Sequence, residues 1–157
     1  MLWREIEAAK VKVDEAILRT PMILSDALSH LTGKEVYLKL ENLQKTGSFK
    51  IRGAYHKLSR FNSSMRKRGV VAASAGNHAQ GVALASSLLG IRATIGMPQG
   101  ASLAKQMATR SYGGEVILYG QDVDEALRYA KGLAGKKKAS FFRSLVKGLK
   151  CREGILT

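Results

Sequence analysis

Apolar and polar positions alternate in a repeating way through the middle of the chain. From about residue 35 to residue 134, short β-rich runs are followed by longer helix-like stretches, with a period of roughly 20 to 25 residues. Such alternation is typical of repeated βα units that form a parallel sheet. The expected strands are Val36–Glu41, Gly69–Ala73, Ile91–Met97 and Glu115–Tyr119. The pattern therefore predicts an α/β fold with an open parallel sheet of about four strands flanked by helices.

Helix-like stretches separate these strands, and one more precedes them. The expected helices are Leu2–Leu18, Phe49–Arg60, Asn77–Leu89, Leu103–Arg110 and Val123–Leu133. In the last of them, Asp122 can cap the first turn, and Glu125 can reach back toward it. Two glycines, Gly96 in the third strand and Gly114 before the fourth, are expected to loosen the sheet at those points.

The character of the chain changes after residue 134, where the repeating pattern ends and residues 135–157 begin. A further strand is due after Ala134, but a lysine-rich segment appears instead. In that segment Phe141, Phe142, Leu145, Val146 and Leu149 are spaced as in a short amphipathic helix. We expect residues 135–157 to be a basic tail that lies outside the fold.

Net charge is the first bulk property that bears on function. The 157 residues hold 26 Lys and Arg against 12 Asp and Glu, a net charge of +14. Residues 136–157 hold seven of these basic residues and one acidic residue, so nearly half of the excess lies in the tail. A basic module that binds nucleic acid or an anionic membrane through this tail is therefore an alternative, but no groove-reading motif supports it. We expect neither a nucleic-acid nor a membrane partner.

The remaining composition excludes several classes of protein. No stretch approaches the roughly 18 apolar residues of a membrane-spanning helix, and the N-terminus lacks the apolar core of a signal peptide. The expected compartment is the cytoplasm. Cys151 is the single cysteine, so an internal disulfide is excluded, and His30, His56 and His78 show no metal-ligand spacing. No metal is expected.

A candidate reactive amine lies where residues 46–54, Thr-Gly-Ser-Phe-Lys-Ile-Arg-Gly-Ala, lead into a helix. If Ser48 is the N-cap, Lys50 falls in the first turn, where the positive end of the helix dipole disfavours its ammonium form. A neutral amine is what Schiff-base chemistry requires. From this spacing alone, a solvated lysine is the more usual interpretation.

A second segment, residues 73–81, follows an apolar strand and opens a helix with the sequence Ala-Ser-Ala-Gly-Asn-His-Ala-Gln-Gly. Its small residues allow a ligand to approach the backbone, and the N–H groups of a helix start suit a carboxylate or a phosphate. Asn77 adds a side chain that both donates and accepts hydrogen bonds. The alternative is an ordinary tight turn with Asn77 as the cap and His78 exposed.

Together the two segments carry a resemblance. Residues 41–54 and 74–81 resemble the signature blocks of threonine dehydratases, which belong to the fold-type II pyridoxal-phosphate enzymes together with tryptophan synthase β chains and serine racemases. Supporting stretches are Arg19–Pro21, Met97–Pro98 and Ala108–Gly113. The similarity runs from about Arg19 to Leu133. It implies the small domain of that fold in residues 46–134 and a part of the large domain in residues 1–45.

The resemblance also implies roles for single residues. Lys50 would hold pyridoxal 5'-phosphate covalently and then, as a free amine, remove the α-proton of the substrate. Phe49 would pack against the cofactor, and Asn77 would hydrogen-bond its phenolic oxygen. The substrate carboxylate would bind the turn formed by Ser74, Ala75, Gly76, Asn77 and His78.

The implied reaction is the deamination of L-threonine, or of L-serine, to 2-oxobutanoate or pyruvate and ammonia. The implied partners are a small amino-acid substrate and, for a full-length member, further copies of itself. Serine racemases place a serine where this chain has Ala75, so racemisation is the weaker alternative. The role would lie in threonine catabolism or isoleucine biosynthesis.

Members of this family exceed 300 residues, and their second half supplies the loop that holds the cofactor phosphate. We therefore expect this chain to be an N-terminal fragment with little or no activity by itself. A frameshift near residue 135 would account for the unrelated tail.

Overall fold

The computed structural model describes residues 2–143. Its helices are α1 (Leu2–Val13), α2 (Asp26–Thr32), α3 (Lys50–Ser59), α4 (Ser63–Arg68), α5 (Asn77–Leu88), α6 (Leu103–Ser111) and α7 (Val123–Lys136), with a 3-10 turn η1 at Glu41–Leu43. Its strands are β1 (Met22–Leu24), β2 (Tyr37–Lys39), β3 (Val70–Ala73), β4 (Ala93–Met97), β5 (Glu115–Leu118) and β6 (Ser140–Phe142).

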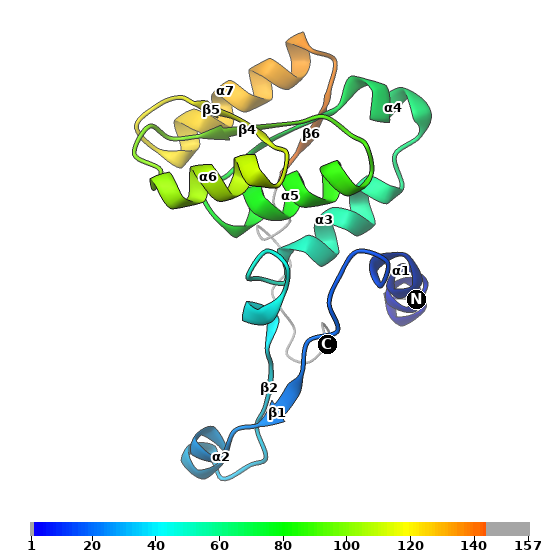
Figure 1. Ribbon diagram of the computed structural model, residues 1–157, viewed down its shortest axis with the longest axis vertical. Helices are drawn as coiled ribbons and strands as arrows, with labels where there is room; N and C mark the ends of the chain where they lie inside the picture. The colour runs from blue at the N-terminus through cyan, green and yellow to red at the C-terminus, as the bar shows by residue number, and fades with distance from the viewer. Residues whose placement is uncertain (1, 144–157) are drawn as a thin grey trace.

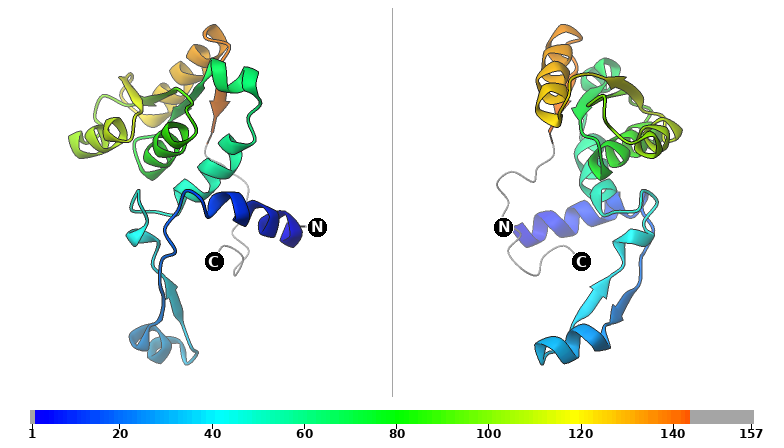
Figure 2. Two further views of the ribbon diagram at one scale, coloured as in Figure 1. Left: turned by 45° about the vertical axis from the view of Figure 1, so that its right-hand side comes forward. Right: turned by 90° about the vertical axis from the view of Figure 1, so that its left-hand side faces the viewer.

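A four-stranded parallel sheet forms the centre of the α/β body, in the order β5-β4-β3-β6. Val71 of β3 is in register with Thr94 of β4 on one side and with Phe141 of β6 on the other. Helices α3, α5 and α6 lie on one side of the sheet and α7 on the other (Figures 1 and 2). This three-layer arrangement confirms the predicted α/β class with a parallel sheet flanked by helices.

The core fills both spaces between the sheet and its helices. Ile51, Leu58, Val82 and Ile95 are fully buried on the side of α3 and α5. A smaller cluster under α7 contains Val71, Ala73, Ala130 and Ala134. Burial on both faces explains why β3 and β4 are apolar at nearly every position.

The strand predicted at Val36–Glu41 is not part of this sheet. Its observed part, Tyr37–Lys39, pairs antiparallel with Met22–Leu24, and α2 joins the two strands. The resulting arm projects away from the body (Figure 1). So short a strand does not specify in its sequence which strand it pairs with. Here the partner is β1, the strand that precedes it along the chain. Of the expected strands, those at Gly69–Ala73, Ile91–Met97 and Glu115–Tyr119 are confirmed, with slightly shorter bounds.

The expectation that residues 135–157 lie outside the fold is wrong for residues 135–142. Helix α7 continues to Lys136, and Lys138 turns the chain with a φ of 49°. β6 then pairs with β3, and Phe142 is 3% exposed in the main core. Residues 136–138 are lysines at the end of α7 and in the turn after it, where charged side chains are easily solvated. The basic composition of this segment is therefore compatible with a strand directly after it. The expected amphipathic helix is wrong at Phe141 and Phe142, and its other positions lie outside the described residues.

Gly96 and Gly114 tighten the body, contrary to the expectation that they loosen it. A Cβ atom at Gly96 would lie 3.2 Å from the Ala126 carbonyl oxygen and 3.3 Å from the Ala130 Cβ, both on α7. At Gly114 it would lie 2.9 Å from the Cβ of Ala83 on α5. Both glycines therefore permit helices to pack closely on the strands.

The capping prediction for α7 is confirmed with one difference. The Asp122 side chain accepts a hydrogen bond from the Glu125 amide at 2.8 Å, as expected of an N-cap. The Glu125 carboxylate reaches back to the amide of Gln121, one residue before the cap, at 2.8 Å.

The arm carries an unusual amount of apolar surface. Met22, Ile23, Leu31 and Tyr37 are each about half exposed or more, and no described segment covers them. Within residues 2–143, none of the helices has both the length and the apolar character needed to cross a bilayer.

Candidate active site

Lys50 is the first residue of α3, directly after the turn of residues 44–49. Gly47 makes that turn with a φ of 67°, and Phe49 occupies the N-cap position without a side-chain cap. Ser48 is therefore not the N-cap, although its hydroxyl accepts a weak hydrogen bond from the Lys50 amide at 3.5 Å. The expected position of Lys50 in the first turn is observed. Its ammonium group lies 5.0 Å from the centroid of the half-exposed Phe49 ring.

The turn between β3 and α5 places a helix N-terminus beside this lysine. The amide of Ser74 donates to the Gly96 carbonyl at 3.1 Å, and the Ser74 hydroxyl accepts from the amide of Gly76 at 3.2 Å. Gly76 is the N-cap of α5 and has no side chain, so no side chain caps the first turn. In the described part of the chain the N–H groups of Asn77 and His78 have no acceptor. These N–H groups and the helix dipole favour an anion.

Gly81 brings the two segments together. It lies in the second turn of α5, and a Cβ atom there would lie 3.0 Å from the carbonyl carbon of Lys50. Only a glycine permits α3 and α5 to approach so closely at this point. The lysine predicted as a reactive amine and the helix start predicted as an anion site are therefore neighbours.

His78 is buried and Gly76 is the N-cap, so the alternative of an ordinary turn was wrong in expecting an exposed His78 and an Asn77 cap. Its side chain is 8% exposed, and its Nε2 atom has no hydrogen-bond partner among the described residues. The ring meets Phe142 edge to face, with centroids 5.2 Å apart. Burial is the main cause that lowers the pKa of His78 from its ordinary value of 6.5. The positive charges of Lys50 and Lys57 lower this pKa further, whereas a hydrogen bond with the Phe142 backbone raises it. Its imidazole is therefore neutral near pH 7.

An ion-pair network that the sequence analysis missed supports the start of α3. Arg52 donates to both oxygens of Glu41, at 2.9 and 2.8 Å, and the Thr20 hydroxyl donates to Glu41 at 2.7 Å. The hydrogen bond from Arg52 is the main cause that holds the pKa of Glu41 below 4.5, and Glu41 in turn raises the pKa of Arg52. The partners are 11 and 21 residues apart, so no local spacing revealed the contact.

Gln44 holds the turn before Lys50 against the N-terminal segment. Its buried amide accepts from the Leu18 N–H at 2.8 Å and donates to the Leu18 carbonyl at 2.9 Å. Next to it, the Lys45 ammonium donates to the Ala16 carbonyl at 2.7 Å. The lysine turn is therefore fixed from the side of α1 as well as from α5.

These residues fit the cofactor that the resemblance implies. Pyridoxal phosphate needs a primary amine to hold it, a surface for its ring and a nearby site for the carboxylate of the amino acid. Lys50 has such an amine, the exposed ring of Phe49 offers an apolar surface, and the uncapped start of α5 presents N–H groups suited to an anion. The glycine contact at position 81 holds the amine close to that site.

Comparison with known proteins gives a consistent result. An L-threonine ammonia-lyase of Thermotoga maritima is 53% identical over 137 residues, which are 87% of this chain and 34% of that protein. The catabolic L-threonine dehydratase TdcB of Staphylococcus aureus is 52% identical over 131 residues, 83% of this chain and 38% of the relative. The chain thus spans little more than a third of the length of these curated relatives.

Solved structures share the fold. The processed form of threonine deaminase isoform 2 from Solanum lycopersicum matches 90% of this chain and 41% of its own, with a TM-score of 0.82 and 38% identity. Maize serine racemase matches 88% of this chain and 42% of its own, with a TM-score of 0.82 and 33% identity. The family model described as "Pyridoxal-phosphate dependent enzyme" matches residues 13–147. The chain therefore belongs to the family of pyridoxal-phosphate-dependent enzymes.

Proposed function

We propose that this chain forms the lysine-bearing and carboxylate-binding part of an L-threonine ammonia-lyase. The reaction converts L-threonine, or L-serine, to 2-oxobutanoate or pyruvate and ammonia. The contact between Gly81 and the backbone of Lys50 carries the proposal, because it holds a primary amine beside an uncapped helix start. An amino acid has both a carboxylate for that helix start and an α-proton for that amine.

The proposal gives each residue a role. Lys50 would hold the cofactor through its amine and, as a free amine, would accept the proton from the substrate α-carbon. The amides of Asn77 and His78 bind the substrate carboxylate, and this orients the α-carbon toward Lys50. The Asn77 side chain is exposed at the mouth of the turn, where it can donate to the cofactor's phenolic oxygen. The bound cofactor supplies an electron sink for the negative charge that develops at the α-carbon.

The comparisons favour ammonia-lyase activity over racemisation. Two relatives, named as an L-threonine ammonia-lyase and a catabolic L-threonine dehydratase, are more than 50% identical to this chain, whereas maize serine racemase is 33% identical. Ala75, in the carboxylate turn, has a methyl group that cannot exchange a proton. A racemase needs a second acid–base group opposite the lysine, and Ala75 does not supply one.

The wider setting is part of the same proposal. A full-length member is expected to be a cytoplasmic homo-oligomer that acts in threonine catabolism or in isoleucine biosynthesis. Residues 2–45 contribute no strand to the four-stranded sheet, which supports their assignment to a larger domain. We expect the 157-residue chain alone to form little or no 2-oxobutanoate from L-threonine.

Covalent labelling tests the role of Lys50. The purified chain is incubated with pyridoxal phosphate, reduced with borohydride, and digested for mass spectrometry. We expect the pyridoxyl group on Lys50, no specific label in Lys50→Ala, and full labelling of Lys50 in Lys105→Ala, which removes an exposed lysine of α6. Equal labelling of many lysines, or an unchanged label in Lys50→Ala, would contradict the proposal.

A further inference from the structure

A hollow of about 450 Å³ lies at the edge of the sheet opposite the candidate active site. It is bordered by the beginnings of β3, β4 and β5 and by the end of α7, whereas Ser74 and Asn77 follow the far end of β3. Its volume falls in the usual range for small-molecule sites. The reaction proposed above does not use it.

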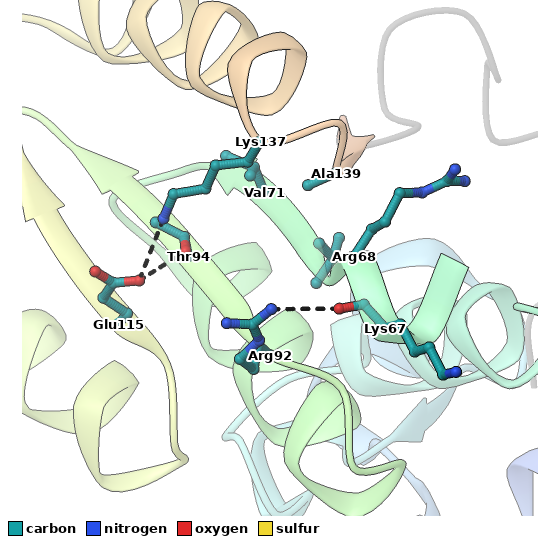
Figure 3. Close-up of a pocket in the computed structure, with 9 residues that line it drawn as sticks. Lys67, Arg68, Val71, Arg92, Thr94, Glu115, Lys137 and Ala139 are labelled. Atoms are coloured by element: carbon teal, nitrogen blue, oxygen red, sulfur yellow. Dashed lines mark hydrogen bonds and ion pairs between the residues drawn. The ribbon is translucent and has the colours of Figure 1, made fainter. Parts of the chain in front are cut away.

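The lining of the hollow is strongly basic. Lys67, Arg68, Arg92 and Lys137 line it together with a single acid, Glu115. That carboxylate already accepts a hydrogen bond from Thr94 at 2.8 Å and pairs with Lys137 at 3.8 Å (Figure 3). Within residues 2–143, no carboxylate lies within ion-pair distance of the other three basic side chains. The local charge is therefore +3.

Helix dipoles account for only part of this charge. Helices α4 and α7 end at this edge, and each C-terminus carries about half a negative charge. Together they offset about one unit, which leaves an excess of about two positive charges. The C-terminus of α5 is left out of this sum of charges, because the Leu89 carbonyl there already accepts a hydrogen bond from Arg66 at 3.2 Å.

The backbone around the hollow is held in place. Gly69 has a φ of 81°, and a Cβ atom there would lie 2.8 Å from the carbonyl oxygen of Arg92. The amide of Val70 donates to that same oxygen at 2.8 Å, and the Arg92 side chain donates to the Lys67 carbonyl at 3.3 Å. Arg92 therefore lies fixed across one side of the hollow, as Figure 3 shows.

The other basic side chains have room to adjust. Lys137 reaches across to Glu115, while the side chains of Lys67 and Arg68 extend outward (Figure 3). Both of these are exposed, and neither makes an ion pair or a side-chain hydrogen bond in the described part of the chain, so turning toward a ligand breaks no such contact. Ala139 adds a partly exposed methyl group to the wall, whereas Val71 borders the hollow from within the core and is only 1% exposed.

We propose that this hollow binds a small molecule that carries a phosphate group. A phosphate dianion matches the excess of about two positive charges, and arginine forks bind phosphate oxygens in pairs. Ala139 borders the space that remains for the rest of the ligand.

Inorganic phosphate is the probe for the test, followed residue by residue by NMR on the 15N-labelled chain. We expect saturable shifts of the amides of Gly69, Arg92 and Ala139. Arg92→Gln is expected to weaken the affinity about tenfold or more, because it removes a charge-assisted hydrogen bond. Lys105→Gln, which makes the same charge change on α6, should bind as the parent chain does.

Arg68→Gln is a second variant in case Arg92→Gln fails to fold. The Arg68 side chain is exposed and makes no ion pair in the described part of the chain, so its replacement should leave the fold intact. It is expected to weaken binding about threefold or more. Shifts confined to residues 74–78 would show that phosphate binds the start of α5 instead. That result, or affinities of both arginine variants equal to that of Lys105→Gln, would overturn the proposal.

Discussion

Gly81 packs closely against the backbone of Lys50, although 30 residues lie between them along the chain. A Cβ atom at Gly81 would lie 3.0 Å from the Lys50 carbonyl carbon and 3.1 Å from the next amide nitrogen. A glycine inside a helix costs about 1 kcal/mol relative to alanine. The gain that offsets this cost is the close packing of α3 on α5, which places Lys50 near the uncapped start of α5.

Replacing this glycine should therefore separate the two helices. We expect Gly81→Ala to lower the free energy of unfolding by about 1 to 3 kcal/mol, since the new methyl group meets backbone atoms that cannot yield without moving a helix. Urea unfolding followed by circular dichroism measures the difference. The matched control is Gly53→Ala in α3, where a Cβ atom has nothing within 4 Å and should stabilise the helix by about 0.5 to 1 kcal/mol. A gain in stability from both variants would contradict the packing argument.

The Glu41–Arg52 pair should make stability depend on pH. Its hydrogen bonds are partly shielded, with 13% of the Glu41 side chain and 28% of the Arg52 side chain exposed. After allowance for solvent screening, we expect Glu41→Gln to lower the free energy of unfolding by about 1 to 2 kcal/mol at pH 7. Urea unfolding of both proteins at several pH values measures this difference.

The direction of the pH effect follows from the pKa of Glu41. The fold holds this pKa below 4.5, so the stabilisation is complete above pH 4.5 and is lost as the pH falls through the lower, folded value. The gap in free energy of unfolding between the parent chain and Glu41→Gln should therefore narrow as the pH falls below 4.5. Glu7→Gln, at an exposed position of α1, should show no such gap. A gap that persists unchanged at pH 3 would argue against the ion pair.

A substitution at Phe142 tests whether the segment after residue 134 belongs to the fold. Its ring is buried in the main core, where it meets His78, and the Lys57 ammonium lies 4.4 Å from its centroid. We expect Phe142→Ala to lower the free energy of unfolding by about 3 to 5 kcal/mol through the lost contacts and the cavity. Chemical denaturation is again the measurement.

The control for this substitution is Leu103→Ala, which removes a side chain that is 66% exposed. Its effect should stay within about 0.5 kcal/mol. If residues 135–142 lay outside the fold, the two alanine variants would unfold alike.

The sequence alone predicted the parts of this fold that depend on local patterns. β3, β4 and β5 are short apolar runs bounded by turns, and α7 has a cap that can be identified from its spacing. The arm was misassigned because a three-residue strand does not specify its partner. β6 was missed because three lysines precede it and only two phenylalanines mark it.

The candidate site shows the same division. Lys50 and the turn from Ser74 to His78 could be selected from their segments, but their proximity could not. That proximity depends on Gly81, because the absence of a side chain there lets α3 and α5 pack closely. The Glu41–Arg52 pair joins distant segments, and the burial of His78 depends on a ring at position 142.

The position of β6 also bears on the order in which the molecule assembles. β3 leads into the turn of residues 74–78, yet one of its two edges is paired only by a strand 70 residues later, since Val70 is in register with Ser140. During synthesis, β4, β5 and their helices emerge while that edge of β3 is still open. Closing so long a loop is slow, and an open edge invites wrong pairing with other chains. The ribosome must therefore release the chain beyond Phe142 before β3, which leads into the turn of residues 74–78, is paired on both edges.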